Sequence, residues 1–316
     1  MGQLSRIGII GAGSIGSAFA LLFADAGYRV RVYDPDLSAA ARSQETISNR
    51  ASQLAQYGLL RSDHERISRL IDYVPTVAEA VNEALLVQES GPEDVVQKRQ
   101  IFADLTAATS PHTILASSSS SIPTSRFVPE TSAERALIAH PGNPPYLLRI
   151  IEIVGNPATS EEVLSRAESI YAKADLTPVR IRQEIEGFVF NRLQGAVLRE
   201  AYALVSEGTV DPDGLDTLVR DGLGLRWAVL GPFATSDLNV RGGIRAHAKR
   251  MGDAYQRMAS GRGPSEAWTE AMIDEVEAAR RREVPLSSWD DAVADRDLEL
   301  MKLLNSRQPN LRKEDR

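Results

Sequence analysis

A histidine and a glutamate in two neighbouring apolar segments are the side chains best suited to acid–base chemistry in this sequence. His140 directly follows the apolar residues 136–139 (ALIA), which have the composition of a buried strand, and it precedes a proline-rich turn. Glu152 lies inside the aliphatic segment 150–154 (IIEIV), where a carboxylate is costly to bury without a partner. An imidazole is a suitable partner, because the carboxylate would fix its tautomer and stabilise the imidazolium formed when histidine acts as a general base. From the residues alone, a strand-end histidine beside an exposed strand acid is the alternative.

The other three histidines have surroundings typical of solvent-exposed side chains. His64 lies among charged residues, His112 follows a proline in a connection, and His247 lies in a basic helical segment. The sequence has no cysteine, which excludes a disulfide framework, a thiolate nucleophile and a Cys-based zinc site. We therefore expect no metal, and His140 is the histidine expected to do chemistry.

Residues 11–16, GAGSIG, have the spacing of a glycine-rich turn that binds a dinucleotide. They follow a predicted strand at 6–10 and open a predicted helix at 14–26, which is the context that this motif requires. Gly11 would permit the tight bend, Gly13 would let the backbone approach the pyrophosphate, and Gly16 would let the helix pack on the strand. The predicted cofactor contacts in this turn are Gly11, Gly13, Ser14, Ile15 and Gly16. A glycine-rich turn without a ligand is the alternative.

An aspartate indicates which dinucleotide is bound. Asp34 follows the second predicted strand, 29–33, and lies 18 residues after Gly16. A carboxylate there can accept hydrogen bonds from both ribose hydroxyls and would repel a 2′-phosphate, so we expect NAD rather than NADP. The glycines alone would also allow FAD.

Short apolar segments alternate with helix-like segments through the first half of the chain. The predicted strands are residues 6–10, 29–33, 71–74, 85–88, 114–117, 136–139, 150–154 and 179–181. This alternation is typical of βαβ units and a mainly parallel sheet. From Gly187 the pattern becomes helical and stays so to the end of the chain. We therefore predict an α/β fold, with a Rossmann-type NAD-binding domain at residues 1–185 followed by an all-helical C-terminal domain at residues 186–316.

Composition and charge argue against other classes of protein. The length of 316 residues corresponds to about two domains, and 36 basic against 43 acidic residues give a formal net charge of −7. An acidic balance argues against nucleic acid as a partner. The longest apolar run, residues 18–24, is far shorter than the roughly 20 residues of a membrane span, and the first residues lack the charged region of a signal peptide. We expect a cytoplasmic protein that acts on a small molecule and binds no membrane.

The spaced motifs together resemble those of the 3-hydroxyacyl-CoA dehydrogenase family over nearly the whole chain. The matching pieces are, in order, the glycine-rich turn with Asp34, residues 89–94 (ESGPED) with Lys98, residues 117–122, His140 with Asn143-Pro144 and Glu152, residues 187–192 (GFVFNR), and residues 231–233 (GPF). The resemblance implies a Rossmann domain followed by a helical domain that mediates dimerisation. Apolar helix faces in the second domain also favour a homodimer.

The resemblance further implies roles for individual residues in catalysis. His140 and Glu152 correspond to the catalytic pair of the family. The serine that contacts the substrate corresponds to Ser120, and the serine on either side of it is a rival for this position. The helix asparagine of the family corresponds to Asn191, which on the residues alone could simply cap the helix.

On the cofactor side, the acid near the nicotinamide ribose corresponds to Glu89, and Lys98 is a further candidate. Within the family the chain is most similar to the branch of λ-crystallin and L-gulonate 3-dehydrogenase, through residues 140–146 (HPGNPPY), 222–228 (GLGLRWA) and 237–239 (DLN). This branch implies NAD-dependent oxidation of the 3-hydroxyl of a small hydroxy acid.

A small acid needs a cation for its carboxylate, and arginine provides a planar, bidentate clamp. We expect Arg226 in this role, with Arg149 as the second choice, although Arg226 beside Trp227 could also be a packed surface pair.

Three other functions fit the motifs. A 3-hydroxyacyl-CoA dehydrogenase, for example for 3-hydroxybutyryl-CoA, would need a basic surface for the CoA phosphates.

An L-carnitine 3-dehydrogenase would need an aromatic cage for the trimethylammonium group, to which Trp227, Tyr146 and Phe233 could contribute. The Arg-Trp-Ala segment does not distinguish an L-carnitine dehydrogenase from an L-gulonate 3-dehydrogenase, because L-carnitine dehydrogenases share this segment. The most distant alternative is a non-catalytic, crystallin-like protein that binds NAD.

Overall fold

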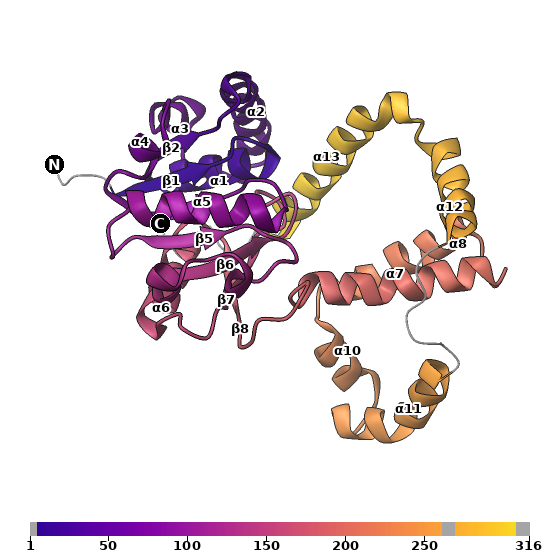
Figure 1. Ribbon diagram of the computed structural model, residues 1–316. Coiled ribbons are helices and arrows are strands. Elements are labelled where there is room, and N and C mark those ends of the chain that lie inside the picture. Colours follow the sequence, from indigo (N-terminus) through magenta and orange to yellow (C-terminus); the bar gives the residue numbers. More distant parts are fainter. Residues whose placement is uncertain (1–4, 261–268, 308–316) are drawn as a thin grey trace. The chain divides into compact units, whose positions relative to one another are not determined.

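A single eight-stranded sheet organises the first part of the chain in the computed structural model, which describes residues 5–260 and 269–307 (Figure 1). The strands are β1 (Arg6–Ile10), β2 (Arg29–Tyr33), β3 (Ile71–Tyr73), β4 (Ala84–Glu89), β5 (Ile114–Ser117), β6 (Ala136–Pro141), β7 (Ile150–Gly155) and β8 (Thr177–Ile181). Their order is β3-β2-β1-β4-β5-β6-β7-β8, and all neighbouring pairs are parallel except β6 and β7. The predicted Rossmann-like sheet is confirmed, whereas the reversal of β7 was not predicted.

The side chains of the strands alternate between two apolar clusters, one on each face of the sheet. On β6, Leu137 and Ala139 belong to one cluster, and Ala136 and Ile138 belong to the other. Helices α1, α2 and α6 cover the first face, and α4 and α5 cover the second. The helices here are α1 (Ser14–Asp25), α2 (Leu37–Gln56), α3 (His64–Arg69), α4 (Val77–Val81), α5 (Val95–Ala108) and α6 (Glu161–Lys173), with 3₁₀ turns at Thr124–Arg126 and Glu130–Arg135. This burial fixes the strand ends where the candidate site lies.

Capping side chains set the starts of helices α2 to α6, and α5 and α6 are two examples. The Asp94 carboxylate accepts a hydrogen bond of 2.8 Å from the Gln97 amide at the start of α5. At the start of α6, the Ser160 hydroxyl accepts one of 3.2 Å from the Val163 amide, and two glutamates lie in the first turn. Both arrangements satisfy amides that the helix itself leaves unpaired.

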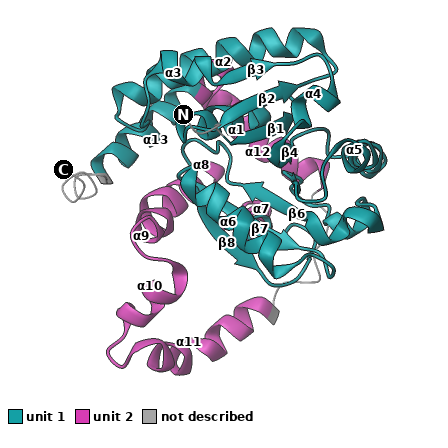
Figure 2. Cartoon of the chain, turned by 90° about the vertical axis from the view of Figure 1, so that its left-hand side faces the viewer, with its two compact units in different colours: residues 1–192, 294–316 teal, residues 193–293 magenta. Residues whose placement is uncertain are grey.

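The chain divides into two compact units, which Figure 2 colours separately. The first comprises Met1–Arg192 and Ala294–Arg316, and the second comprises Leu193–Val293. The later helices are α7 (Phe190–Ser206), α8 (Pro212–Thr217), a π-helical segment (Leu218–Gly224), α9 (Leu225–Trp227), α10 (Pro232–Asn239), α11 (Gly243–Ser260), α12 (Glu270–Glu283), a 3₁₀ turn (Leu286–Ser288) and α13 (Trp289–Arg307). The predicted helical C-terminal domain is thus confirmed, and the boundary after residue 185 stays a prediction.

The part of α13 that belongs to the first unit is anchored there by a buried aspartate in the middle of the helix. The Asp297 side chain is 1% exposed, accepts a hydrogen bond of 3.0 Å from the Tyr146 hydroxyl, and lies 3.4 Å from the Arg50 guanidinium. Burial raises the pKa of Tyr146 to about 12, so its hydroxyl remains a donor at neutral pH. Met301, one helical turn beyond, is also buried.

The second unit exposes several large apolar side chains. Phe233 is 82% exposed, Val229 77% and Leu238 72%. Exposed apolar side chains that gather into a patch are typical of surfaces that bind another protein. No helix in the described residues combines the length and apolar character needed to cross a membrane.

Candidate active site

The glycine-rich turn between β1 and α1 has the geometry that its spacing predicts. Gly11 has a φ of +102°, and its amide donates to the Tyr33 carbonyl over 2.8 Å. A β-carbon at Gly11 would lie 2.6 Å from the Ser90 carbonyl oxygen, and one at Gly16 would lie 1.9 Å from the Gly11 oxygen. Side chains are therefore excluded at both positions, as close packing of the turn, strand and helix requires.

The outer side of the same turn is open. A β-carbon at Gly13 would meet no atom within 4 Å, and Gly13 begins α1 without any capping side chain. The amides of the first turn of α1, including those of Ser14 and Ile15, therefore remain available to an anion at the helix N-terminus. An open cradle with free amides fits the pyrophosphate of a dinucleotide.

Asp34 lies beside this cradle at the end of β2. One of its oxygens accepts a hydrogen bond of 2.7 Å from the Ala12 amide, and the other accepts one of 2.9 Å from the Asp36 amide. The structure thus brings together Gly11, Gly13, Ser14, Ile15, Gly16 and Asp34, the six residues predicted for the pyrophosphate and adenosine ribose.

His140 and Glu152 are in contact. They are directly opposed in the antiparallel pair of β6 and β7, with 2.8 Å between Nδ1 of His140 and Oε2 of Glu152. The two side chains are 8% and 4% exposed. Nε2 of His140 has no hydrogen-bond partner within the part of the chain that the structure describes. The pair therefore offers one free ring nitrogen, with the other held by a carboxylate.

Glu152 is held as a carboxylate by three donors. Its Oε1 accepts hydrogen bonds from the amides of Val189 and Phe190, at 2.9 and 3.0 Å, and its Oε2 faces His140. Burial opposes the charge, but the contact with His140 and the two amides outweighs it and holds the pKa of Glu152 below its ordinary value. A carboxylate inside an aliphatic strand is therefore ionised at neutral pH.

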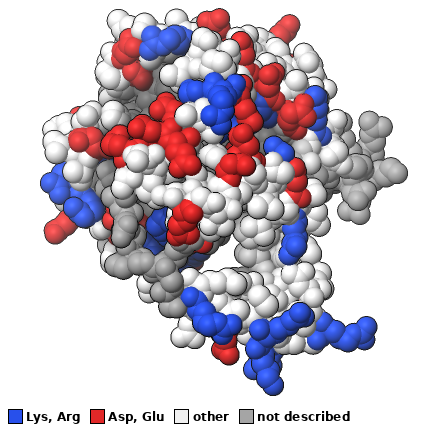
Figure 3. Space-filling view, turned by 90° about the vertical axis from the view of Figure 1, so that its right-hand side faces the viewer, with Lys and Arg blue, Asp and Glu red and all other residues white. Residues whose placement is uncertain are grey.

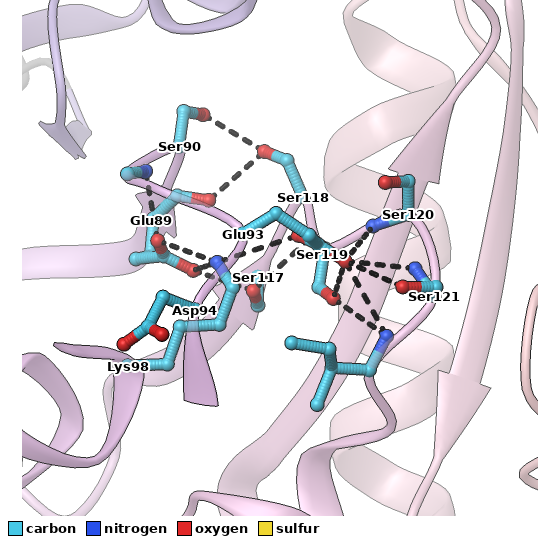
Figure 4. A network of polar contacts seen from close by, with 12 residues as sticks. Glu89, Ser90, Glu93, Asp94, Lys98, Ser117, Ser118, Ser119, Ser120 and Ser121 are labelled. Atoms are coloured by element: carbon cyan, nitrogen blue, oxygen red, sulfur yellow. Dashed lines mark hydrogen bonds and ion pairs between the residues drawn. The ribbon is translucent and has the colours of Figure 1, made fainter. Parts of the chain in front are cut away.

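The serine run after β5 forms a tight loop around one carboxylate oxygen (Figure 4). Oε1 of Glu93 accepts hydrogen bonds from the hydroxyls of Ser119 and Ser121, at 2.8 and 3.1 Å, and from the amides of Ser120 and Ser121, at 3.0 and 2.9 Å. Burial opposes the charge of Glu93, but these donors and Lys98 hold its pKa below the ordinary value. The Ser120 hydroxyl has no partner among the described residues, so within this run it remains available to a ligand.

Asn191, in the first turn of α7, reaches the same loop. Its side-chain amide donates a hydrogen bond of 2.9 Å to the Ser120 carbonyl oxygen. The structure therefore brings Asn191 and Ser120 together, and the Asn191 side chain binds another segment instead of capping its own helix.

Glu89 and Lys98 form a closed, buried ion pair beneath this loop (Figure 4). Nζ of Lys98 lies 2.9 and 3.0 Å from the two carboxylate oxygens of Glu89, and the side chains are 1% and 0% exposed. The same carboxylate also accepts hydrogen bonds from the Gly91 amide and the Ser117 hydroxyl. These contacts are internal to the protein, so they do not by themselves support a cofactor contact for either residue.

Glu93 is the residue that sequence reasoning missed. Its side chain is 36% exposed, and it also lies 3.9 Å from Lys98. In the sequence it stands within the segment 89–94, from which only Glu89 was given a role. The signal that could have singled it out is the serine run itself, since four or more donors in one short loop need an acceptor.

The two predicted arginines have different surroundings. The Arg149 guanidinium donates to the Asp175 carboxylate and to the carbonyls of Tyr146 and Leu59, so its donors are engaged within the protein. Arg226 lies on α9 in the second unit, is exposed, and has no side-chain partner among the described residues. Of the two, Arg226 is the one with free donors.

Comparison with known proteins identifies the family. The NAD-binding domain of 3-hydroxyacyl-CoA dehydrogenase matches residues 6–185, and the C-terminal domain of the same family matches residues 187–284. The λ-crystallin of Oryctolagus cuniculus is 36% identical over 281 residues, which cover 88% of this chain and 88% of that protein.

Two further relatives carry the names of dehydrogenases. A 3-hydroxyacyl-CoA dehydrogenase of Gibberella moniliformis is 34% identical over 316 residues and covers 97% of this chain and 96% of its own length. An L-carnitine dehydrogenase of Streptomyces griseus is 34% identical over 316 residues, and the match covers 96% of this chain and 90% of that protein. With an NAD cradle, a His–Glu pair and two domain matches in order, this chain belongs to the 3-hydroxyacyl-CoA dehydrogenase family of NAD-dependent oxidoreductases.

Proposed function

We propose that the chain oxidises the 3-hydroxyl of a small hydroxy acid with NAD, and that L-gulonate is the leading candidate substrate. The observation that carries this proposal is the buried His140–Glu152 pair, in which Nδ1 is held and Nε2 is free. A histidine so arranged can accept a proton from an alcohol, as a general base must. The segments 140–146, 222–228 and 237–239, which resemble the branch of λ-crystallin and L-gulonate 3-dehydrogenase, favour a small acid over a CoA ester.

In the proposed reaction the substrate hydroxyl donates a hydrogen bond to Nε2 of His140, which takes the proton as the carbon loses a hydride. Bound NAD supplies the hydride acceptor. Glu152 keeps the ring in place through Nδ1 and stabilises the imidazolium. The free hydroxyl of Ser120 and the Asn191 side chain are proposed to hydrogen-bond the reacting oxygen or its neighbours. The cofactor is held at residues 11–16 and Asp34.

A cation is needed for the carboxylate of a small acid, and we propose Arg226. Its exposed guanidinium can form the bidentate pair that a carboxylate favours. Arg149 remains the second choice, but a role there would require it to give up its contacts with Asp175 and two carbonyls.

L-carnitine is less well supported as a substrate, because one member of the expected aromatic cage is engaged elsewhere. The Tyr146 ring is 9% exposed, its hydroxyl binds Asp297, and the Arg50 guanidinium lies 5.7 Å from its centroid. A ring already covered by one cation is poorly placed to bind a second. Trp227 and Phe233 remain exposed.

A CoA ester is the second candidate because the second unit carries a basic helix. Among the 18 residues of α11 are Arg245, Lys249 and Arg250, with Asp253 as the single acid. Figure 3 also shows Lys and Arg side chains gathered at the lower edge of this face, with an acidic side chain beside them. Phosphates of CoA would be attracted to such a group.

The test is a substrate panel. The protein is incubated with NAD and with L-gulonate, L-carnitine, L-3-hydroxybutyrate or a 3-hydroxyacyl-CoA in separate reactions, and NADH formation is followed. The highest kcat/KM with L-gulonate supports the proposal, and a strong preference for the CoA ester or for L-carnitine overturns it. Binding of NAD without turnover of any substrate would support the non-catalytic alternative. Repeating the panel with NADP tests Asp34, since comparable rates with both cofactors would contradict its proposed role.

We also propose a homodimer formed through the second unit. Its exposed apolar side chains, including Val229, Phe233 and Leu238, support this proposal, because isolated soluble chains rarely leave so many uncovered. Sedimentation analysis tests it, and a single monomeric species at micromolar concentration would contradict it.

A further inference from the structure

The segment that joins the sheet unit to α7 contains a buried aromatic residue with an unusual backbone. Gly187 and Phe188 both have left-handed conformations, with φ values of 73° and 45°. Glycine adopts this region freely, whereas a bulky residue rarely does. The other left-handed residues with a side chain in the described chain are Glu83 and Asp175, which are largely exposed, whereas Phe188 is 0% exposed. A buried phenylalanine in this conformation has to be held there by its surroundings.

The turn that this conformation produces points two main-chain donors at Glu152. The amides of Val189 and Phe190, the two residues directly after Phe188, both donate to Oε1 of Glu152. The other oxygen of the same carboxylate faces Nδ1 of His140. Because Glu152 lies in an aliphatic strand, loss of these amides would leave half of a buried carboxylate without donors.

The Phe188 ring holds the turn in place by packing into the apolar core beside the His–Glu pair. It belongs to the apolar cluster that includes Ile138 of β6 and Val154 of β7, the strands that carry the His–Glu pair. Its centroid lies 5.6 Å from that of the His140 ring, with the planes tilted by 47°. The ring therefore packs against the imidazole while its own backbone directs the donors to Glu152.

The same short segment also reaches the serine loop. Asn191, three residues after Phe188, donates to the Ser120 carbonyl. One turn therefore touches both the pair proposed to move the proton and the loop proposed to contact the substrate.

We propose that Phe188 is a positioning residue for the dehydrogenase reaction: its left-handed backbone delivers the Val189 and Phe190 amides to Glu152, and its ring packs beside His140. This inference rests on the proposed role of His140 as the base. In this proposal the backbone conformation of Phe188 matters for activity. If Phe188 only filled space in the core, the volume of its ring alone would matter.

Two substitutions at Phe188 separate these roles because they have opposite effects on backbone and bulk. Phe188→Gly removes the ring but favours the left-handed conformation, and Phe188→Val keeps apolar volume but strongly disfavours it. If the turn matters, kcat of the Gly variant exceeds that of the Val variant by about tenfold. If Phe188 only fills space, the Val variant is equal or better, and this result would overturn the proposal. The dissociation constant of NAD, whose site lies on β1, α1 and β2, reports whether each variant is folded.

A second pair of variants tests the donors without changing Phe188. Phe190 is the first residue of α7, where proline is tolerated but has no N–H to donate. Phe190→Ala removes the same ring and keeps the donor, so it is the matched control for Phe190→Pro. Loss of a donor makes the Glu152 carboxylate more basic, so it stabilises the imidazolium of His140 more strongly. The acid limb of kcat/KM, which follows protonation of the base, should therefore lie about one pH unit higher in the Pro variant than in the Ala variant. Identical acid limbs would contradict the role of the main-chain donors.

His140→Gln, assayed beside these variants, separates failure of this inference from failure of the proposed function. If His140→Gln keeps the wild-type kcat, the base is wrongly assigned, and the positioning role falls with it. The other outcome has three parts: His140→Gln loses activity, kcat of Phe188→Gly does not exceed that of Phe188→Val, and the acid limbs of kcat/KM in Phe190→Pro and Phe190→Ala coincide. In that case the assignment of His140 as the base stands and the positioning role of Phe188 is wrong.

Discussion

His140 and Glu152 face each other across β6 and β7, with 2.8 Å between Nδ1 and Oε2. In an antiparallel pair, directly opposed residues have β-carbons about 4.5–5.5 Å apart, so the strand register alone brings the two side chains into reach. A slip of one residue would turn Glu152 to the opposite face of the sheet. The reversal of β7 is therefore the structural reason that a carboxylate twelve residues along the chain can orient the histidine.

The first prediction concerns the base. His140→Gln should lower kcat by about a hundredfold to ten-thousandfold, because a positioned general base contributes an acceleration of that order. Binding of NAD should be unchanged, since the cradle at residues 11–16 lies on other elements. Steady-state kinetics and a fluorescence titration with NAD measure the two effects.

His112→Gln is the control for this prediction, because His112 is exposed in a connection away from either strand. It should keep the wild-type kcat. Wild-type turnover in the His140 variant would remove this residue from the mechanism.

The second prediction concerns the pH dependence of stability. The pKa of Glu152 in the folded chain lies below its ordinary value of 4.5, so the folded state favours the carboxylate. The stability that this provides is fully present above pH 4.5 and is lost as the pH falls through the lower, folded pKa. Glu152→Gln removes the titrating group, so the difference in free energy of unfolding between wild type and variant should be largest at neutral pH and shrink in acid.

Urea unfolding of both proteins over a pH series checks this expectation. Asp36→Asn is the exposed comparison. The hydrogen bonds with Ser38 and Arg42 also lower the pKa of Asp36, but solvent screens these contacts, so the difference that this variant makes to the free energy of unfolding should be smaller than that of Glu152→Gln. If the difference in free energy of unfolding between wild type and Glu152→Gln stayed constant across the acid range, the ionised carboxylate would not be the form that stabilises the fold.

Much of the sheet unit follows from local sequence patterns. The strand segments, the glycine-rich turn and Asp34 lie where short-range rules place them, since each rule depends on neighbours within a few residues. The need of Glu152 for a partner was also predictable, because the cost of burying a charge is independent of topology.

The features that were not predictable depend on contacts between distant residues. An aliphatic run such as residues 150–154 has the same pattern in a parallel and an antiparallel strand, so the reversal of β7 leaves no local signal. The return of α13 to the first unit depends on Asp297 meeting Tyr146, 151 residues earlier. The left-handed backbone of Phe188 is imposed by its buried surroundings, against the preference of the residue itself.

The third prediction distinguishes Ser120 from Ser119 as the serine that contacts the substrate. Ser120→Ala should lower kcat with little change in stability, because its hydroxyl has no partner among the described residues. Ser119→Ala should instead lower the free energy of unfolding by about 1–3 kcal/mol, because the buried Ser119 hydroxyl donates to Glu93 over 2.8 Å. Kinetics and urea unfolding of the two variants distinguish the positions. The reverse result, with kcat lost in the Ser119 variant and retained in the Ser120 variant, would move the substrate contact by one residue.

The fourth prediction concerns the carboxylate clamp. Arg226→Leu should raise KM for the preferred acid by about tenfold or more, because it would remove the proposed charge-assisted, bidentate contact. The binding of NAD should not change. Arg220→Leu is the matched control from the same stretch of the second unit, since Arg220 is already paired with Asp221 over 2.8 Å and has no proposed role.

A KM that rises in the Arg226 variant and not in the Arg220 variant supports the clamp. If neither variant changes KM, the carboxylate is bound elsewhere, and Arg149→Leu becomes the informative variant. Because Arg149 donates to Asp175 and to two carbonyls, that substitution should also lower the free energy of unfolding. A rise in KM at Arg149 without any loss of stability would indicate that those internal contacts give way to the substrate.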